Sequence, residues 1–393
     1  MKILHVLQGT VGGSIEFLNL LLPQLKAKGY VNVVACPQYS ALREKCIAQG
    51  VEYIELDMCR EVSFIKDISS LLHLLKIIKE QNYDILHAHS SKAGVVGRLA
   101  AWLKGIPSVY TAHGWSFNMR VSNRKKIFYS TIERALYHIT ETITCVSQYE
   151  VDSAMGVGIA SNKLIKIDNA IDLTKYHFQE DVGQLKERLG IPKDKIIIGM
   201  VARITEQKNP FLFLDVACAL KERLENIYFL YVGDGELRKP LEERMASLGL
   251  TDRVLITGWV DQPELYIKCF DIGILTSKWE GFGLVLVEYM ACRVPVVASN
   301  VDGIPYVVTD GYSGLLCESG NVNQFVNKIC SLLQDRTLVD RLTSNAYREA
   351  HEKFSIARTA ASYDLVYKKI KKSVTAQAQG EESPFAPGAH WPP

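Results

Sequence analysis

The sequence predicts an α/β protein with two domains, each built on a parallel β-sheet. Short apolar runs alternate with longer segments of helical periodicity along most of the chain, which is the pattern of parallel strands joined by helices. This alternation stops near residues 168–195, in a charged stretch that contains Gly190-Ile191-Pro192, and then starts again. At 393 residues the chain is long enough for two hydrophobic cores.

The first series of strands and helices occupies residues 1–168. Strands are expected at 3–7, 31–35, 51–56, 85–89, 108–112 and 142–146. Helices are expected at 15–28, 63–81, 93–104 and 124–138. Helical segments of this length between strands favour a parallel, Rossmann-like sheet.

The second series occupies residues 169–354. Its strands are expected at 196–201, 227–232, 253–257, 272–275, 294–298 and 314–317. A last helix, about 355–372, is expected to return to the first domain, and we interpret residues 373–393 as a disordered tail or a cloning scar. Two such domains imply a cleft, with the ligand at the carboxyl ends of the strands that face it.

Composition favours a cytoplasmic protein without a nucleic-acid partner. Hydrophobic residues make up 48% and charged residues 22% of the chain, and the net charge of +2 is spread along it. The nine cysteines form no Cys-x-x-Cys pair, which predicts buried free thiols. No signal-peptide pattern is present, and no apolar run reaches about eighteen residues. We expect at most a peripheral contact with a membrane surface.

The most informative stretch is 276–291, where a glycine-containing turn follows an apolar strand and leads into a helix near Gly283. Glu280 lies on the turn, and Glu288 lies about one and a half turns into the helix. Gly281 and Gly283 let a ligand approach the backbone, and the helix N-terminus favours an anion or a hydroxyl-rich group. This arrangement predicts a phosphorylated, polyhydroxylated ligand.

The spacing Glu280-x7-Glu288, with Gly-Phe-Gly after the first glutamate and Met-Ala-Cys-Arg-Val-Pro-Val-Val-Ala-Ser after the second, resembles a known family. That family is the retaining GT-B glycosyltransferases of group 1. The resemblance covers most of residues 1–372 and implies two Rossmann-like domains facing a central cleft. It also implies that Glu280, Phe282 and Gly283 hold the donor sugar and that Glu288 holds the nucleotide ribose. The alternative is that both glutamates are solvated helix charges.

Arg203 and Lys208 follow the first strand of the second domain. Transfer from a nucleotide diphosphate sugar requires compensation of the charge on the leaving diphosphate, and two preorganised cations supply it without a metal. Their spacing resembles the Arg-x4-Lys pair of the family, in which both residues bind the diphosphate. No Asp-x-Asp is present, and we expect neither a metal nor another cofactor. Solvated loop cations are the alternative.

Other assignments follow from position and resemblance. His113 resembles the family histidine beside the transferred sugar, although a structural histidine is the alternative. His87 and His89 share one strand face, but no carboxylate or cysteine lies nearby in sequence, so no metal site is predicted. The remaining donor-binding candidates are Gly12, Gly13, Gly233, Val260, Gly281 and Leu284, and the acceptor-binding candidates are Ser90, Ser91 and Lys92.

The sequence departs from the family pattern at a few positions. Arg293 stands where a helix-ending glycine is common, which requires a left-handed conformation or a different cap. Asp302 and Tyr306 stand where glycine and glutamate are frequent, so the contacts of that loop are not carried over. Ala170 replaces a usual glycine in the turn between the domains.

The resemblance implies a retaining enzyme that moves a hexose or N-acetylhexosamine from a nucleotide diphosphate sugar, expected to be a UDP-sugar. The acceptor would be a glycan or a polyprenyl-diphosphate-linked glycan in capsule, O-antigen or exopolysaccharide assembly. The alternatives are another GT-B reaction, such as a nucleotide-sugar epimerase or a phosphorylase, and a non-catalytic sugar-binding protein. One expectation is a basic and aromatic face for membrane contact, and the equally favoured alternative is a solvated helix face; the residues are Arg120, Arg124, Lys125, Lys126, Phe128 and Tyr129.

Overall fold

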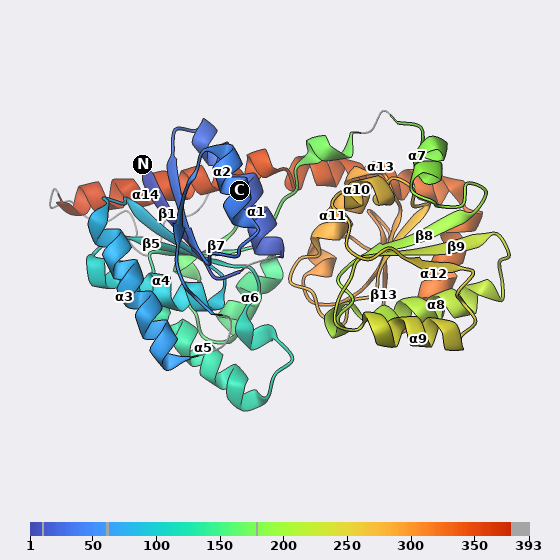
Figure 1. Cartoon of the computed structure of the whole chain (residues 1–393), viewed down its shortest axis with the longest axis horizontal. Coiled ribbons are helices and arrows are strands. Elements are labelled where there is room, and N and C mark those ends of the chain that lie inside the picture. Colours follow the sequence, from blue (N-terminus) through green and yellow to red (C-terminus); the bar gives the residue numbers. More distant parts are fainter. Residues whose placement is uncertain (10–11, 60–62, 178–179, 379–393) are drawn as a thin grey trace. The chain divides into compact units, whose positions relative to one another are not determined.

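The computed structural model describes residues 1–9, 12–59, 63–177 and 180–378 (Figure 1). The chain forms two compact units. Unit 1 contains Met1–Asn169 and the C-terminal helix that begins at Ile356, and unit 2 contains Ala170–Ser355. Both are α/β structures with a parallel sheet, as the alternation of apolar runs and helical segments predicts.

Unit 1 is built on a seven-stranded parallel sheet of order β3-β2-β1-β4-β5-β6-β7. Its strands are β1 (Lys2–Leu7), β2 (Val31–Cys36), β3 (Glu52–Glu55), β4 (Ile85–His89), β5 (Ser108–Ala112), β6 (Thr142–Cys145) and β7 (Leu164–Lys166). Its helices are α1 (Gly13–Ala27), α2 (Leu42–Gln49), α3 (Phe64–Glu80), α4 (Ser91–Lys104), α5 (Asn123–Tyr137), α6 (Gln148–Gly156) and α14 (Ile356–Ala378), with short 3₁₀ turns at Ser116–Asn118 and Ser161–Lys163. The strand order reverses between β1 and β4, where ligands of such sheets bind.

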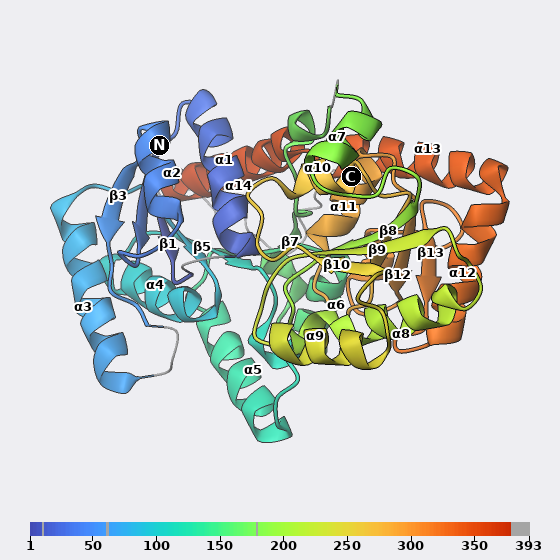
Figure 2. The same cartoon turned by 45° about the vertical axis from the view of Figure 1, so that its right-hand side comes forward.

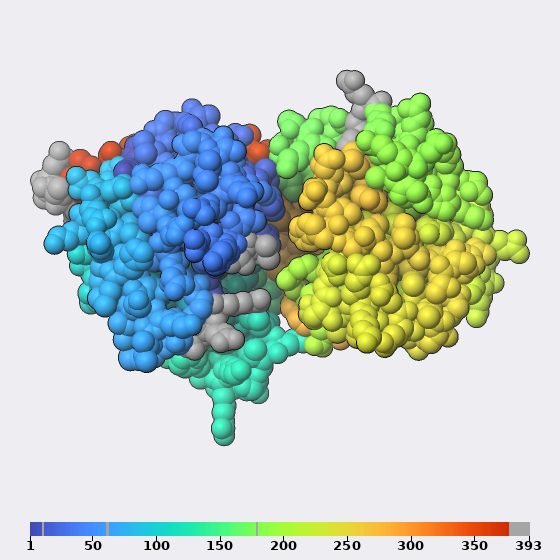
Figure 3. All heavy atoms as spheres, in the orientation of Figure 1, coloured from blue at the N-terminus to red at the C-terminus, as the bar shows by residue number. Residues whose placement is uncertain are grey.

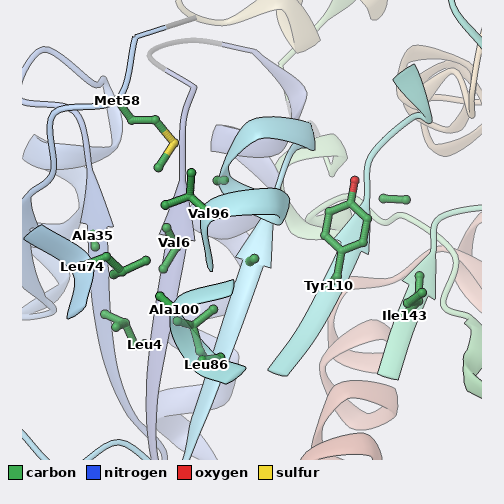
Figure 4. Close-up of a cluster of buried hydrophobic side chains, with 14 of the residues drawn as sticks. Leu4, Val6, Ala35, Met58, Leu74, Leu86, Val96, Ala100, Tyr110 and Ile143 are labelled. Carbon is green, nitrogen blue, oxygen red and sulfur yellow. The ribbon is translucent and has the colours of Figure 1, made fainter. Parts of the chain in front are cut away.

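The two faces of the unit 1 sheet differ in character. Helices α3 and α4 cover one face and α1 and α14 cover the other (Figures 1 and 2). Figure 4 shows Leu4, Val6 and Leu86 of the sheet beside Val96 and Ala100 of α4, in a cluster of buried hydrophobic side chains. Because side chains alternate along a strand, the intervening residues face α1 and α14.

Glycines bring α4 close to the sheet. A Cβ atom on Gly94 would lie 2.5 Å from the Tyr110 ring, and one on Gly97 would lie 3.0 Å from the Leu86 side chain. Side-chain volume at these two positions would therefore push the helix outward. Since α4 follows directly from β4, its close packing fixes the loop between them, which carries Ser90.

Unit 2 is built on a six-stranded parallel sheet of order β10-β9-β8-β11-β12-β13. Its strands are β8 (Ile196–Val201), β9 (Ile227–Val232), β10 (Val254–Ile256), β11 (Ile272–Leu275), β12 (Val296–Ser299) and β13 (Leu315–Cys317). Its helices are α7 (Val182–Arg188), α8 (Pro210–Lys221), α9 (Arg238–Ser247), α10 (Pro263–Ile267), α11 (Leu284–Ala291), α12 (Val322–Gln334) and α13 (Arg336–Lys353), with 3₁₀ turns at Leu173–Tyr176, Glu206–Lys208 and Ile304–Tyr306. Helices α8 and α9 lie on one side of the sheet and α10 and α11 on the other (Figure 2). Here the order reverses between β8 and β11.

Helix α14 belongs to unit 1 although it follows unit 2 in sequence. It continues to Ala378, so the predicted end at about 372 is wrong and Ser373 is buried in the helix; the rest of the predicted tail, 379–393, lies outside the described residues.

Helix α14 packs against α1, and its Tyr363 and Tyr367 are fully buried. Tyr30 Oη donates to Asp364 Oδ1 at 2.7 Å, and Thr359 Oγ1 donates to the carbonyl of Asp168 at 3.0 Å. Helix α14 therefore supplies part of the core of unit 1.

Arg293 adopts the left-handed conformation that the sequence left open, with φ of 57°. Its guanidinium carbon lies 3.8 Å from the centre of the Tyr347 ring on α13. A cation–π contact of this kind contributes about 0.5–1 kcal/mol and offsets part of the backbone strain that a glycine would avoid.

All nine cysteines are free thiols, as predicted, but the expected burial holds for only five of them, Cys36, Cys46, Cys145, Cys269 and Cys317. Among the described residues, no helix is both long enough and apolar enough to cross a bilayer.

Candidate functional site

The candidate donor site of unit 2 lies where two loops meet at the carboxyl ends of β8 and β11. These strands are neighbours in the sheet, so the loops that follow them lie side by side. Lys278 N donates to the carbonyl of Gln207 at 2.8 Å, and Thr276 Oγ1 donates to the carbonyl of Lys208 at 2.9 Å. The first loop carries Arg203 and Lys208, and the second carries Glu280.

The structure brings Lys208 and Glu280 together in an ion pair. Lys208 Nζ donates to Glu280 Oε2, and only 16% and 12% of the two side chains are exposed. The Glu280 amide donates to Asp302 Oδ2 at 3.0 Å, which holds the turn in place. The cation and the carboxylate that the resemblance assigns to the diphosphate and to the sugar therefore lie in contact with each other.

Arg203 is exposed on the same loop. Its carbonyl accepts hydrogen bonds from Thr205 N at 2.9 Å and from Tyr231 Oη at 3.3 Å. Within the described ranges, its guanidinium has no hydrogen bond or ion pair. The backbone at Arg203 is thus anchored while its charge is available to a ligand.

Backbone contacts shape the turn before α11. A Cβ atom on Gly303 would lie 2.0 Å from the carbonyl oxygen of Gly281, and Gly303 N donates to the carbonyl of Glu280 at 2.8 Å. Gly283 has φ of 85° and precedes the helix, in a conformation that favours glycine. Phe282 is buried against Phe354, with ring centres 5.5 Å apart. The Phe282 side chain is therefore structural, and its contribution to a ligand would come from its amide.

Glu288 lies half-buried on α11 and accepts a hydrogen bond from Tyr176. Burial, followed by the nearby Glu288 charge, raises the pKa of Tyr176 well above its usual value. Tyr176 belongs to the 3₁₀ turn Leu173–Tyr176, just after the change of unit. The sequence analysis missed this residue, because no motif marks an isolated tyrosine 112 positions from its partner (288 − 176).

The remaining donor-side candidates lie on neighbouring turns. A Cβ atom on Gly233, which has φ of 147°, would lie 2.0 Å from the Ala202 carbonyl oxygen. Gly233 therefore permits close contact between the loops after β8 and β9. Val260 is half-buried on the loop after β10, next to Trp259, which is 72% exposed. Leu284 is the first residue of α11.

In unit 1, the loops after β1, β4 and β5 carry the other candidates. Gly12 precedes α1 with φ of 117° and Gly13 is its first residue; a Cβ atom added to either would meet no described atom within 4 Å. His113 follows β5, and its ring centre lies 4.9 Å from that of Phe17 on α1. The carboxyl end of this sheet thus carries the sterically open backbone of Gly12 and Gly13 and the imidazole of His113.

The acceptor candidates differ in their contacts. Lys92 Nζ lies 2.7 Å from Asp67 Oδ1, so its charge is already compensated. Ser91 Oγ accepts from Ser116 Oγ at 2.5 Å. Ser90 has φ of 71°, and its buried Oγ has no hydrogen-bond partner among the described residues. Left-handed backbone in a serine is strained, and Ser90 is the candidate whose geometry is hardest to explain by packing alone.

Three buried histidines, His5, His87 and His89, have ring nitrogens within 4.8 Å of one another, which is the spacing of a metal site. Both nitrogens of each ring already have partners, however. His87 pairs with Tyr367 Oη and Thr111 Oγ1, each at 2.6 Å. The other two rings contact each other, with their second nitrogens facing Asn32 and His113. A metal would have to displace hydrogen bonds, so the described geometry favours a hydrogen-bonded network.

Comparison with known proteins gives two family matches that together cover most of the chain. The family described as Glycosyl transferases group 1 matches residues 181–349, and Glycosyltransferase Family 4 matches residues 11–175. A UDP-Gal:alpha-D-GlcNAc-diphosphoundecaprenol alpha-1,3-galactosyltransferase of Escherichia coli is 32% identical over 287 residues, which is 72% of this chain and 74% of that protein. An uncharacterized 41.2 kDa protein in the cps region of Klebsiella pneumoniae is 30% identical over 94% of this chain and 99% of its own length.

Solved structures share the fold. Anabaena HepE in complex with UDP superposes with a TM-score of 0.82 at 22% identity, covering 94% of this chain and all of that chain. WaaG, a glycosyltransferase involved in lipopolysaccharide biosynthesis, superposes with a TM-score of 0.72 at 15% identity over 93% of this chain and 99% of its own. These matches confirm the GT-B fold. The chain belongs to the glycosyl transferases group 1 family and is a glycosyltransferase.

Proposed function

We propose that the enzyme transfers a hexose or N-acetylhexosamine from a UDP-sugar, with retention and without a metal, to a polyprenyl-diphosphate-linked glycan in cell-surface polysaccharide assembly. The paired Lys208 and Glu280 beside the exposed Arg203 carry the proposal. The Escherichia coli relative, named for UDP-Gal and a diphosphoundecaprenol-linked acceptor, supports the choice of substrates.

The contacts at the loops suggest how these residues act. Lys208 and Arg203 would compensate the negative charge on the diphosphate as the bond to the sugar anomeric carbon breaks. Glu280, released from Lys208, would accept hydrogen bonds from sugar hydroxyls, and Glu288 would accept them from the ribose. The acceptor oxygen would form its bond to the anomeric carbon on the face that the diphosphate leaves, and its proton would pass to a diphosphate oxygen. Arg203, Lys208 and Glu280 lie on the two loops, and Glu288 lies on α11.

The nucleotide part of the proposal predicts a selective thermal shift. A ligand at about 100 times its dissociation constant stabilises the native state by about 2.7 kcal/mol. We expect UDP to raise the melting midpoint, and GDP, ADP and CMP to leave it nearly unchanged. Arg203→Ala and Glu288→Ala should each lose most of the UDP shift, because one removes a diphosphate cation and the other the ribose acceptor. Equal shifts by all four nucleotides, or full shifts in both variants, would reject the UDP assignment.

Retention is tested on the product. Proton NMR of the first-formed product should show the anomeric configuration of the donor sugar. An inverted product would remove the retaining mechanism, and interconversion of two nucleotide sugars without an acceptor would identify an epimerase. Saturable sugar binding without turnover would identify a binding protein.

The membrane proposal concerns α5, which lies on the surface of unit 1 (Figure 3). Ile127 and Phe128 are 66% and 56% exposed, and Lys125 and Lys126 are exposed beside them. Tyr129 is partly buried and packs against the apolar cluster of unit 1, so it offers less surface than Phe128. A lipid-linked acceptor lies in a membrane, so its use would bring the enzyme to a membrane surface.

Vesicle sedimentation tests the membrane proposal. Each basic residue near an anionic surface contributes about 1 kcal/mol, so Lys125→Glu/Lys126→Glu should weaken binding to anionic vesicles by at least about tenfold. The matched control is Arg223→Glu/Lys239→Glu, which makes the same charge change at exposed positions of unit 2. Equal loss in both variants would indicate a general charge effect, and no loss in the α5 variant would end the proposal.

A further inference from the structure

Four side chains of unit 1 form a continuous line of hydrogen bonds that ends at His113. Asn32 Oδ1 lies 3.2 Å from His5 Nε2, His5 Nδ1 lies 3.3 Å from His89 Nε2, and His89 Nδ1 lies 3.2 Å from His113 Nε2. We call these four residues the Asn32–His113 line. They come from β2, β1, β4 and the end of β5, which are consecutive in the sheet order. The line therefore crosses the sheet strand by strand.

Asn32 determines which atom donates and which accepts in each hydrogen bond of the line. Asn32 Nδ2 donates to the carbonyl of Leu22 at 3.4 Å, so its amide oxygen is the atom that faces His5. An amide oxygen only accepts hydrogen bonds, so the His5 proton must be on Nε2. A neutral imidazole carries one proton, and this leaves His5 Nδ1 as an acceptor.

The same rule passes along the rest of the line. His89 must carry its proton on Nε2 to donate to His5, which leaves its Nδ1 as an acceptor. His113 must then carry its proton on Nε2 to donate to His89. The other nitrogen of His113, Nδ1, is left with a lone pair, and it has no hydrogen bond within the described part of the chain. One buried amide thus determines the tautomer of a ring three residues away along the line.

The surroundings keep every ring of the line neutral. Burial lowers the pKa of His5 to about 4 and that of His113 to about 4, and burial followed by the neighbouring histidines lowers the pKa of His89 well below its usual value. Among the described residues, His87 of β4 packs against His5 and His89 of the line, and Tyr363 and Tyr367 of α14 pack in turn against His87.

These neighbours are uncharged as well. Burial lowers the pKa of His87 and raises the pKa of Tyr363 to about 12 and that of Tyr367 well above its usual value. The rings of the line and these neighbours are therefore all neutral at neutral pH. Each histidine of the line keeps the donor and acceptor nitrogens that Asn32 determines.

We propose that Asn32, His5 and His89 are positioning residues that hold His113 as its Nε2–H tautomer, so that His113 offers an unprotonated Nδ1 to a hydroxyl of the transferred sugar. The proposal rests on the proposed function, which assigns His113 to the sugar. His113 then accepts a hydrogen bond and does not supply a proton. This specifies the ligand group it suits, which is a hydroxyl that donates.

Two substitutions at Asn32 distinguish the effect of its acceptor oxygen from the effect of its side-chain packing. Asn32→Asp and Asn32→Leu both remove the donor to Leu22, but only aspartate keeps an oxygen that accepts from His5 Nε2. Near pH 8.5 we expect kcat/KM of Asn32→Asp to stay within about threefold of wild type and that of Asn32→Leu to fall at least about tenfold. Should Asn32→Leu fail to fold, the aspartate variant still gives the pH test below.

The aspartate variant carries a pH signature that a structural role does not predict. A carboxylate beside His5 raises its pKa by about 1–3 units. Once protonated, His5 donates from both nitrogens, so the protons of His89 and His113 must change sides and His113 becomes the Nδ1–H tautomer. Its sugar-facing nitrogen then loses the lone pair. The kcat/KM of Asn32→Asp should therefore fall as the pH drops from about 8.5 to about 6, while that of wild type stays flat.

Long-range proton–nitrogen NMR on protein labelled with ¹⁵N-histidine reads the tautomer directly, with the His113 signals identified by their absence in His113→Gln. The expected result is Nε2–H in wild type at both pH values and a change to Nδ1–H in Asn32→Asp at the lower one. The proposal is overturned if the aspartate variant keeps both the wild-type pH profile and the wild-type tautomer. A wild type that transfers no sugar but whose variant shows the tautomer change would support the positioning role and reject the proposed function.

Discussion

Unit 1 is expected to lose stability steeply in mild acid. His5, His87 and His89 are fully buried, and burial lowers the pKa of each, to about 4 for His5. In the unfolded chain these histidines have a pKa of about 6.5. Between these values the unfolded state binds more protons than the native state, so stability is present above about pH 6.5 and is lost as the pH falls.

The size of the effect follows from the number of rings. Each ring contributes about 1.4 kcal/mol per pH unit, so these three remove about 4 kcal/mol per unit below about pH 6.5. His113, whose pKa burial also lowers to about 4, adds to the loss in the same direction. Urea unfolding followed at pH 7.5 and 5.5 measures this. Unit 2 is the internal control, because its described histidines, His177 and His351, are not buried. Unit 1 should unfold first in acid, and equal loss of stability in both units would contradict the prediction.

The second large effect is expected at the Lys208–Glu280 pair. Lys208→Met should lower kcat by about 10²–10³ because the diphosphate loses a preorganised cation, and Glu280→Gln should lower it similarly because the sugar loses an ionised acceptor. Each single change also leaves the partner's charge unpaired in a largely buried site. The double variant should therefore lose much less than the product of the two single losses.

The same loops provide a matched control. Lys278 Nζ lies 3.3 Å from Glu206 Oε1, so in this second pair the lysine belongs to the loop after β11 and the glutamate to the loop after β8. The two side chains are 32% and 69% exposed. Exposed ion pairs contribute little, so Lys278→Met should change kcat by no more than about twofold. Initial rates at saturating donor decide the matter. Strictly multiplicative losses for Lys208 and Glu280, or an equally damaging Lys278→Met, would show that the pair does not act as a unit.

Much of the fold was predictable because local patterns determine it. The runs at 3–7, 85–89 and 272–275 are apolar except for the buried His5, His87 and His89, and strands of a covered parallel sheet are buried on both faces in this way. Helices α2 and α6 were missed because each buries only two side chains and shows weak periodicity. Strand ends shifted by a residue or two, as at Glu52–Glu55 against 51–56, because ladder hydrogen bonds rather than hydrophobicity determine where pairing stops.

In the candidate site too, some residues were predictable from local sequence and others were not. Lys208 and Glu280 were recognisable because each lies a short distance after its own strand. Asp302 was set aside as a departure from the family pattern, yet its carboxylate accepts from the Glu280 amide. Asn32 and His5 gave no sequence signal, since their contacts depend on which strands are neighbours. Sheet order is a property of the whole chain, and no local spacing contains it.

Helix α14 has a consequence for the order in which the chain matures. Its Tyr363 and Tyr367 hydroxyls contact Thr111 and His87 inside unit 1. During synthesis, Thr111 and His87 lack these hydrogen-bond partners until the residues of α14 have left the ribosome. All of unit 2 is made before that moment. The half that is translated first is therefore the half that completes its interior last, and a nascent chain released before Ile356 would carry an open N-terminal half.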